Sequence, residues 1–241
     1  MGHVAALVNP SMPEAFLKKI RRFSSSPVEF IRLEASPSES FPLFGHPDII
    51  GAVCGRIFFH CPCLKEPILE KIRSFHIKTI RGTSFLKKIY PADVPYNSLI
   101  IENQLLLHNL RSTDDSIKNY VRHHQWRFLD VPQGYTRCSV VPVDKRSFIT
   151  DDDSISRSLK SAGYRVCQIT KGFVRLKGYP YGFIGGASAC LDDKVFFFGD
   201  IRNHPGYASV RDFIKERGKK VVSIGSCELE DFGGIHFFKS E

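Results

Sequence analysis

The sequence predicts an α/β fold in which five copies of a strand–strand–helix–strand (ββαβ) unit close into a ring. Residues 134–169 show the unit most plainly: two short apolar strands flank a polar turn, three aspartates begin a helix, and Gly163 separates that helix from a third strand. The same order recurs roughly every 40–50 residues, a spacing typical of ring and solenoid architectures. Residues 234–238 add a lone strand with no helix after it.

Four copies are complete. In each, two apolar strands are joined by a short polar or glycine-bearing turn, and a helix leads into a third strand. In chain order, the strand, strand, helix and strand of these copies are Asp48–Val53, Arg56–His60, Glu66–Phe75 and Ile77–Arg81; Asn97–Ile101, Gln104–His108, Thr113–His124 and Trp126–Val131; Thr136–Val143, Ser147–Thr150, Ile155–Ala162 and Tyr164–Ile169; Ala187–Leu191, Lys194–Phe198, Tyr207–Arg217 and Lys219–Ile224.

The first copy lacks its opening strand. Residues His3–Val8, Pro13–Phe23 and Val28–Leu33 match only the second strand, the helix and the third strand of the unit. We expect the C-terminal strand Gly234–Phe238 to lie beside His3–Val8, because this pairing closes the ring and removes two exposed sheet edges. Such a ring folds as one unit, so residues 1–241 are predicted to form a single domain.

The composition indicates a protein of the cytoplasm. Of the 241 residues 42% are apolar, which is ample for a core, and no apolar stretch approaches the roughly 18 residues that a membrane span needs. The first residues lack the basic region and the apolar run of a signal peptide. The seven cysteines are an odd number and are scattered, so we expect reduced thiols rather than a disulfide framework.

The net charge of +9 has two interpretations. It keeps the protein soluble, or it attracts an anionic partner such as nucleic acid or a carboxylate or phosphate metabolite. The basic residues are spread over the predicted helices without a dense run, and no nucleic-acid motif with interleaved aromatic residues is visible.

A small polar or thiol side chain stands near the start of the opening strand in every complete copy. Aligned on the turns, these residues are Asp48, Asn97, Cys138 and Ser188. In a ring, equivalent positions all face the axis or all face away from it, so the four favour a central channel with a small-molecule pocket. The alternative is that they satisfy backbone groups at the strand ends near the ring centre.

Three segments carry a family resemblance: residues 134–139 (Gly-Tyr-Thr-Arg-Cys-Ser), 182–188 (Gly-Phe-Ile-Gly-Gly-Ala-Ser) and 231–235 (Asp-Phe-Gly-Gly-Ile). Together with the repeats they resemble the pentein, or α/β-propeller, superfamily. Its members include arginine deiminases, dimethylarginine hydrolases, amidinotransferases and a ribosome anti-association factor. The three segments are also similar to those of an uncharacterised, pentein-like bacterial family. This resemblance extends over most of the chain from His46 onward.

The resemblance implies a thiol nucleophile in the last strand after Gly-Gly, a histidine as general acid/base, and carboxylates that hold a guanidinium group. Phe237 stands where that cysteine would be, which departs from the catalytic pattern. Asp48 matches the family's carboxylate, and residues 186–188 (Gly-Ala-Ser) occupy the place of the histidine.

Cys138 is the candidate nucleophile, with Arg137 or a nearby histidine to lower its pKa. Arg137 points away from Cys138 along a strand, so its help would be indirect, and the alternative is a buried structural cysteine. Asp48 is a candidate for binding a guanidinium or ammonium group, or else a turn carboxylate. His60 and His108 end equivalent strands and are candidate acid/base groups or solvated strand ends.

Six further residues are candidates for ligand binding around the channel. Amide and hydroxyl groups there can form hydrogen bonds with a ligand, and paired glycines let the backbone approach it closely. For the threonine and the aspartate among them, the simpler interpretation is a helix N-cap. The six are Asn97, Ser188, Gly185, Gly186, Thr150 and Asp152.

A zinc site at His60, Cys61 and Cys63 with Cys54 is disfavoured, because Cys-x-Cys is a poor spacing for structural zinc and Cys54 lies across a turn. No metal and no cofactor is predicted.

Two functions remain open. One is a thiol-dependent hydrolase or transferase that acts on a guanidinium- or amine-bearing small metabolite. The other is a non-catalytic binding module that uses the ring as a platform for a protein or ribosomal partner, which the missing cysteine of the last strand favours.

Overall fold

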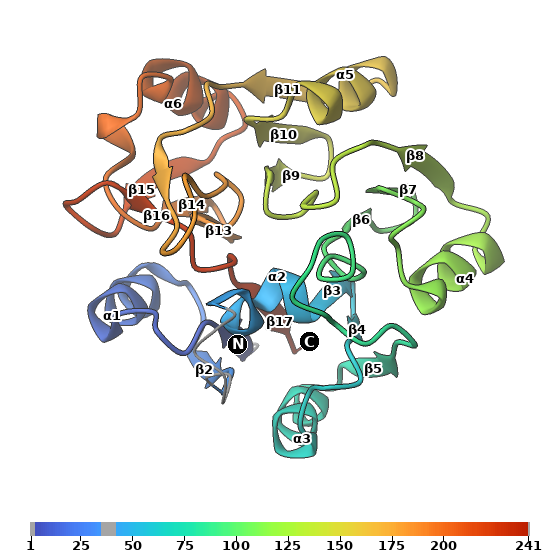
Figure 1. The fold of residues 1–241 in the computed structure, drawn as a ribbon. Coiled ribbons are helices and arrows are strands. Elements are labelled where there is room, and N and C mark those ends of the chain that lie inside the picture. The colour runs from blue at the N-terminus through green and yellow to red at the C-terminus, as the bar shows by residue number, and fades with distance from the viewer. Residues whose placement is uncertain (1–2, 35–41, 241) are drawn as a thin grey trace.

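A computed structural model describes residues 3–34 and 42–240 (Figure 1). These residues form five three-stranded sheets and a two-stranded sheet, and the three-stranded sheets share one topology. In each, the first strand is antiparallel to the middle strand, and the middle strand is parallel to the third, which it reaches through a helix. The four sheets predicted as complete copies contain β3 (Gly51–Cys54), β4 (Ile57–His60), α3 (Glu66–Ser74) and β5 (Lys78–Arg81); β6 (Leu99–Ile101), β7 (Leu105–His108), α4 (Asp115–His123) and β8 (Arg127–Asp130); β9 (Val140–Asp144), β10 (Ser147–Thr150), α5 (Asp153–Ser161) and β11 (Arg165–Gln168); β13 (Ser188–Leu191), β14 (Lys194–Phe197), α6 (Tyr207–Lys215) and β15 (Lys220–Ser223).

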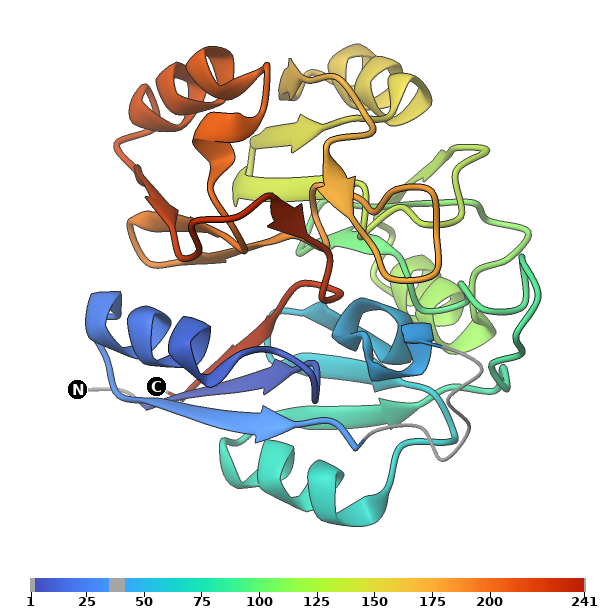
Figure 2. The same ribbon diagram turned by 60° about the vertical axis from the view of Figure 1, so that its left-hand side comes forward.

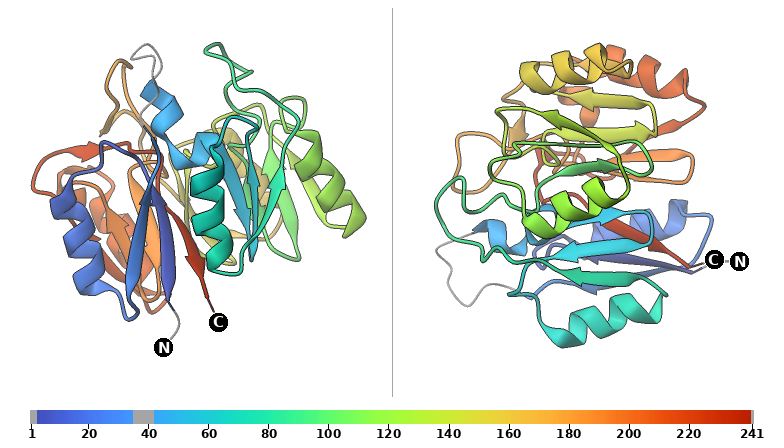
Figure 3. Two further views of the ribbon diagram at one scale, coloured as in Figure 1. Left: turned by 90° about the horizontal axis from the view of Figure 1, so that it is seen from below. Right: turned by 90° about the vertical axis from the view of Figure 1, so that its right-hand side faces the viewer.

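The fifth three-stranded sheet joins the two ends of the chain. It contains β1 (Val4–Val8), α1 (Glu14–Phe23), β2 (Val28–Arg32) and the C-terminal β17 (His236–Lys239). Strand β17 pairs antiparallel with β1, with Leu7 opposite His236, so the predicted pairing of the C-terminal segment with residues 3–8 is confirmed. Figure 3 shows both termini at the same edge of the molecule.

The sheets lie around a common centre. Figure 1 shows the five long helices on the outside and the first strand of each sheet nearest the middle, and Figure 2 shows α1, α3, α5 and α6 along the outer edges of the molecule. These inner strands also touch from one sheet to the next, β3 against β6 and β9 against β13. Every residue of β1 is buried, as expected for a strand that is covered on both faces.

The apolar core fills the space between neighbouring sheets and their helices. Leu17 and Ile20 form the buried face of α1 and pack with Val4 and Ala6 of β1. Phe58 of β4 meets Phe238 of β17 edge to face, with ring centroids 5.4 Å apart. Aromatic pairs of this kind tie one sheet to the next.

The segment before β3 differs from the prediction. Residues Asp48–Val53 were expected as one strand, but Pro47–Ile50 form a short helix, α2, and β3 begins only at Gly51. Proline suits the first turn of a helix because the N–H groups of that turn have no partner within the helix, so the N–H that proline lacks is not needed there. The strand expected from Thr136 likewise begins only at Val140. Four short elements were not predicted: the 3-10 helix η1 (Pro42–Gly45) before α2, the 3-10 helix η2 (Ile201–Asn203) between β14 and α6, and a two-stranded sheet of β12 (Val174–Arg175) and β16 (Leu229–Glu230).

The expectation of reduced thiols is wrong at one pair. Cys61 and Cys63 form a disulfide at the corner after β4, where their Cα atoms lie 5.3 Å apart, within the range that a disulfide spans. The other cysteines, Cys54, Cys138, Cys167, Cys190 and Cys227, are free. Within the described ranges, no helix has the length and apolar character needed to cross a bilayer.

The Asp114 side chain connects the start of α4 to the loop after β5 through hydrogen bonds. Its buried carboxylate accepts hydrogen bonds from the backbone N–H groups of Ser84 at 2.7 Å and Ser116 at 2.9 Å, and from the Tyr96 hydroxyl at 3.1 Å. Burial alone would raise the pKa of Asp114, but hydrogen bonds from Ser116 and Ser84 outweigh burial and hold the pKa well below its usual range.

We therefore expect Asp114→Ala to lower the free energy of unfolding by about 3 kcal/mol, because it removes a helix cap and leaves buried N–H groups without an acceptor. Urea denaturation measures this loss. Asp115→Ala, in the same helical turn but exposed, is the control and should cost less than about 1 kcal/mol. Since the pKa of Asp114 is lowered, its contribution is present above 3.8 and is lost as the pH falls below that value. Equal losses in the two variants would contradict this role.

Candidate functional site

Asp48, Asn97 and Cys138 come together in one buried cluster, held by the side chain of Asn97. The Asn97 Nδ2 donates to the Asp48 carbonyl oxygen at 2.9 Å and to Cys138 Sγ at 2.9 Å. Its Oδ1 accepts from the backbone N–H groups of Arg137 at 2.8 Å and Cys138 at 3.1 Å. The Cys138 thiol in turn donates to Asp48 Oδ2 at 3.1 Å.

The fourth predicted member, Ser188, does not occupy the same position. Ser188 lies within β13 and pairs with Phe197, whereas Cys138 lies two residues before Val140, the residue of β9 that pairs with Thr150. The Ser188 hydroxyl donates to the Gly185 carbonyl oxygen at 3.2 Å, and among the described residues no hydrogen bond joins it to the cluster. Alignment on the turns could not reveal this shift, because the four opening strands do not all begin at the same distance from the aligned residue.

A second carboxylate, Asp231, borders the cluster. Its oxygens accept hydrogen bonds from the N–H groups of Phe183 and Gly233, each at 2.9 Å, and Oδ1 lies 3.6 Å from His46 Nδ1. A Cβ at Gly186 would lie 1.9 Å from Asp231 Oδ1, so only glycine lets the backbone pass this carboxylate. A Cβ at Gly185 would similarly meet the carbonyl oxygens of the segment that carries Cys138.

Burial pushes this cluster toward its neutral forms. Burial raises the pKa of Asp48 to about 6, with His46 opposing the shift and Asp231 adding to it. Burial and the Asp48 carboxylate raise the pKa of the Cys138 thiol well above its usual value, and burial raises that of Asp231. Asp48 Oδ1 and His46 Nδ1 are buried without a hydrogen-bond partner among the described residues. Asp48 and Asp231 are thus two buried carboxylates, and one oxygen of Asp48 has no hydrogen-bond partner among the described residues. A cation bound between them would stabilise their ionised forms.

An apolar cover closes the cluster from outside. Leu43 and Ile49 pack on Cys138, with Leu86, Tyr135 and Phe183 around them. The Tyr135 hydroxyl donates to the Asp93 carboxylate, which holds this cover in place. A ligand therefore reaches the cluster only when these side chains move.

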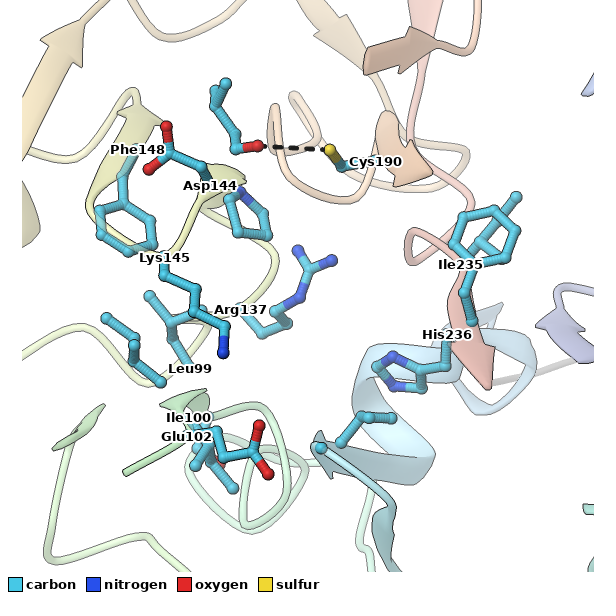
Figure 4. Close-up of a pocket in the computed structure, with 17 residues that line it drawn as sticks. Leu99, Ile100, Glu102, Arg137, Asp144, Lys145, Phe148, Cys190, Ile235 and His236 are labelled. Carbon is cyan, nitrogen blue, oxygen red and sulfur yellow. Dashed lines mark hydrogen bonds between the residues drawn. The ribbon is translucent and has the colours of Figure 1, made fainter. Parts of the chain in front are cut away.

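A cavity of about 400 Å³ lies near the centre, between the inner strands, and different residues line it (Figure 4). Arg137 and His236 point into it, together with Glu102, Lys145 and Cys190. Asp48, Asn97, Cys138 and Ser188 do not line this cavity. Of these lining residues the sequence pointed only to Arg137, because the repeat pattern marks the start of each opening strand, whereas most of the lining comes from residues farther along the strands and from their turns.

His236 is fixed as a neutral imidazole. Its Nε2 lies 3.0 Å from the Pro47 carbonyl oxygen and 2.9 Å from that of Gly51, and because both oxygens only accept, Nε2 carries the proton. Burial, followed by the charge of Arg137, lowers the pKa of His236 to about 4. Its Nδ1 is therefore an acceptor.

The two histidines predicted as acid/base candidates lie elsewhere. His60 and His108 end equivalent strands, as expected, but both are buried rather than solvated. His60 Nδ1 contacts the Cys61 carbonyl oxygen at 2.9 Å, and His108 bridges the Thr113 hydroxyl and the Gly134 carbonyl oxygen. Burial lowers the pKa of His108 to about 4. No hydrogen bond between described residues joins either ring to Cys138, and their catalytic role stays a prediction.

Thr150 and Asp152 hold backbone groups. The Thr150 hydroxyl donates to the Ser139 carbonyl oxygen at 2.7 Å, and Asp152 caps α5 by accepting from the Ile155 N–H at 2.9 Å. Asp152 is thus the helix N-cap of the simpler interpretation, whereas Thr150 is not the cap residue itself and accepts from the Asp152 N–H at 3.2 Å. The ligand-binding role of both residues stays a prediction. In the part of the chain that the structure covers, no group of three or more histidine, cysteine or acidic residues is placed to hold a metal ion.

Comparison with known proteins gives a family and a fold. Residues 7–236 match the family described as "Family of unknown function (DUF6873)". No curated protein matches the sequence.

Similar solved structures include DDAH from Pseudomonas aeruginosa complexed with citrulline, with a TM-score of 0.58, 11% identity, and coverage of 93% of this chain and 92% of that one. Agmatine deiminase from C. jejuni with substrate bound has a TM-score of 0.56 and 10% identity, and covers 99% and 93% of the two chains. The amidinotransferase SxtG from Microseira wollei has a TM-score of 0.55 and 10% identity, with 92% and 88% covered. These structures are pentein superfamily members, so the chain has the pentein fold, as its sequence predicted.

The raised pKa of Asp48 predicts a pH effect on stability. Because this carboxyl holds its proton more tightly in the folded chain, its contribution is full below 3.8 and is lost as the pH rises to about 6. We expect Asp48→Asn, which keeps the shape and cannot ionise, to show a smaller fall in unfolding free energy over this interval, measured by urea denaturation. Asp115→Asn is the exposed control. A wild-type profile that Asp48→Asn leaves unchanged would overturn the assignment.

Proposed function

This chain belongs to the family of unknown function DUF6873 and has the pentein fold, and from that premise we propose that it is a thiol-dependent hydrolase or transferase acting on a guanidinium- or amine-bearing small metabolite. The observation that carries the proposal is the contact of the Cys138 thiol with the Asp48 carboxylate, beside a second buried carboxylate.

A cationic ligand would change the protonation of this cluster. A guanidinium group between Asp48 and Asp231 supplies the positive charge that these buried carboxylates lack, so both ionise on binding. The same charge favours the thiolate of Cys138 over the thiol. The free site therefore holds protons, and the liganded site releases them.

The chemistry then follows from the positions of the groups. The Cys138 thiolate adds to the electrophilic carbon of the ligand, and the C–N bond to the leaving amine breaks. The leaving amine takes a proton, for which His46, beside Asp231, is the proposed donor. Water then releases the product in a hydrolase, and an acceptor amine does so in a transferase.

The proposed architecture is a single domain, residues 1–241, arranged as a five-repeat α/β-propeller closed by its C-terminal strand. The shared topology of the five three-stranded sheets and the pairing of β17 with β1 support it. The names of the similar structures support the ligand class, because citrulline, agmatine and amidino groups belong to guanidino chemistry.

The alternative is binding without turnover. It is favoured by the raised pKa of Cys138, by the apolar cover, and by Phe237 at the place of the family's cysteine. In this version the carboxylates still select a cationic small molecule. The ribosomal or anionic partner considered from the sequence draws no support from the similar structures.

Selective alkylation tests the catalytic version. Chloroacetamidine is cationic and chloroacetamide is its neutral counterpart with the same leaving group. We expect chloroacetamidine to modify Cys138 about tenfold faster than chloroacetamide does, because the two carboxylates attract the cation and the cation favours the thiolate. Peptide mass mapping over time gives both rates.

The exposed Cys227 in the same sample is the internal control and should show a much smaller preference for the cationic reagent. Asp48→Asn should abolish the preference at Cys138 without changing that at Cys227. If Cys138 reacts with chloroacetamidine no faster than it does in the unfolded chain, catalysis by this thiol is wrong.

Binding of methylguanidinium tests the part that both versions share. Its affinity, measured by calorimetry, should fall as the pH drops through about 6, because protonated Asp48 no longer attracts the cation. The number of protons released on binding, corrected for the buffer, should rise as the pH falls through this value, because the free Asp48 then carries a proton that the bound cation displaces. Affinity that stays constant over this interval, or that Asp48→Asn leaves intact, would contradict the cationic site.

A further inference from the structure

The central cavity is separate from the cluster of Asp48 and Cys138. Arg137 and Cys138 are consecutive residues, and their side chains leave opposite sides of the segment before β9: Cys138 toward Asp48, Arg137 into the cavity. The cavity ends at the polar turns of the inner strands, where Gly55, Glu102 and Lys145 line it. The apolar cover of the cluster contributes no residue to its lining.

The Arg137 guanidinium enters this cavity without a counter-charge in contact. Its Nη1 donates to the Val140 carbonyl oxygen at 2.9 Å, and the side chain is only partly accessible. Among the described residues no carboxylate forms an ion pair with it, although Asp48 attracts it at longer range. A half-buried charge that lacks a paired anion is costly, and an anionic ligand would relieve that cost.

The surrounding walls favour an anion that carries an apolar body. Phe148, Ile235 and Phe237 are apolar parts of the lining, and the Lys145 ammonium stands at the mouth beside Glu102 (Figure 4). His236 presents an acceptor nitrogen rather than a second positive charge. A volume of about 400 Å³ lies toward the small end of the range for ligand pockets.

We propose that this cavity is a second binding site, which takes a small organic carboxylate on the guanidinium of Arg137. The planar guanidinium matches the two oxygens of a carboxylate, and its remaining N–H groups point into open space. A phosphate would place up to two negative charges in a site where Glu102 already contributes one, and it would leave the apolar walls uncovered. The inference stands independently of the function proposed for the cluster.

Calorimetric titration with three probes tests the proposal: benzoate, its neutral analogue benzamide, and inorganic phosphate. We expect benzoate to bind and the other two to bind about tenfold more weakly or not at all, because only benzoate combines a carboxylate with an apolar body. Arg137→Gln should weaken benzoate about tenfold or more, the loss expected for a charged hydrogen-bonding partner.

Lys145→Glu keeps the proposal testable if Arg137→Gln fails to fold, because Lys145 is exposed at a turn. It should weaken benzoate about threefold at low salt, and less at high salt. Lys160→Glu, the same change at an exposed position of α5 outside the cavity, is the matched control and should leave the affinity for benzoate unchanged. The proposal is overturned if benzoate does not bind, if benzamide or phosphate binds as well as benzoate, or if both Lys→Glu variants behave alike.

Discussion

The amide group of Asn97 is the contact on which the centre of the molecule depends. Wholly buried, it holds the Asp48 carbonyl group and the N–H groups of Arg137 and Cys138 at once. Three segments far apart in the chain are thereby fixed at one point: α2, the turn before β6, and the turn before β9. A carboxamide suits this position because it donates on one side and accepts on the other without carrying charge into the interior.

The same contact separates opposite charges. With its backbone fixed by Asn97, the segment directs the Cys138 thiol toward the acidic cluster and the Arg137 guanidinium toward the cavity. The cluster holds two buried carboxylates whose pKa values are raised, and among the described residues no Lys or Arg forms an ion pair with either of them. The cavity holds the partly buried guanidinium of Arg137, which forms no ion pair with a carboxylate of the described residues. The two proposed binding sites, one for a cation and one for a carboxylate, therefore lie on opposite sides of the segment before β9.

Local patterns predicted much of the architecture correctly. The apolar strands, the polar turns and the amphipathic helices each have a period that short-range sequence reveals, and the lone C-terminal strand matched the missing strand of the first copy. The pattern failed at Asp48, where Pro47 begins a helical turn, and at Ser188, which is already paired inside its strand. It also failed at Cys61 and Cys63, because a disulfide depends on the bend of the chain after β4.

The spacing of residues in the sequence determined the order of strands and helices, because apolar periodicity and turn chemistry act over a few positions. It also determined that polar groups stand where the inner strands begin. Which polar groups meet was settled by packing. Asp48 and Cys138 are 90 positions apart, and their contact depends on how neighbouring sheets lie against each other. The register of each strand decided which side chains face the cluster and which face the cavity. Consecutive residues point to opposite sides, so Cys138 faces the cluster and its neighbour Arg137 faces the cavity.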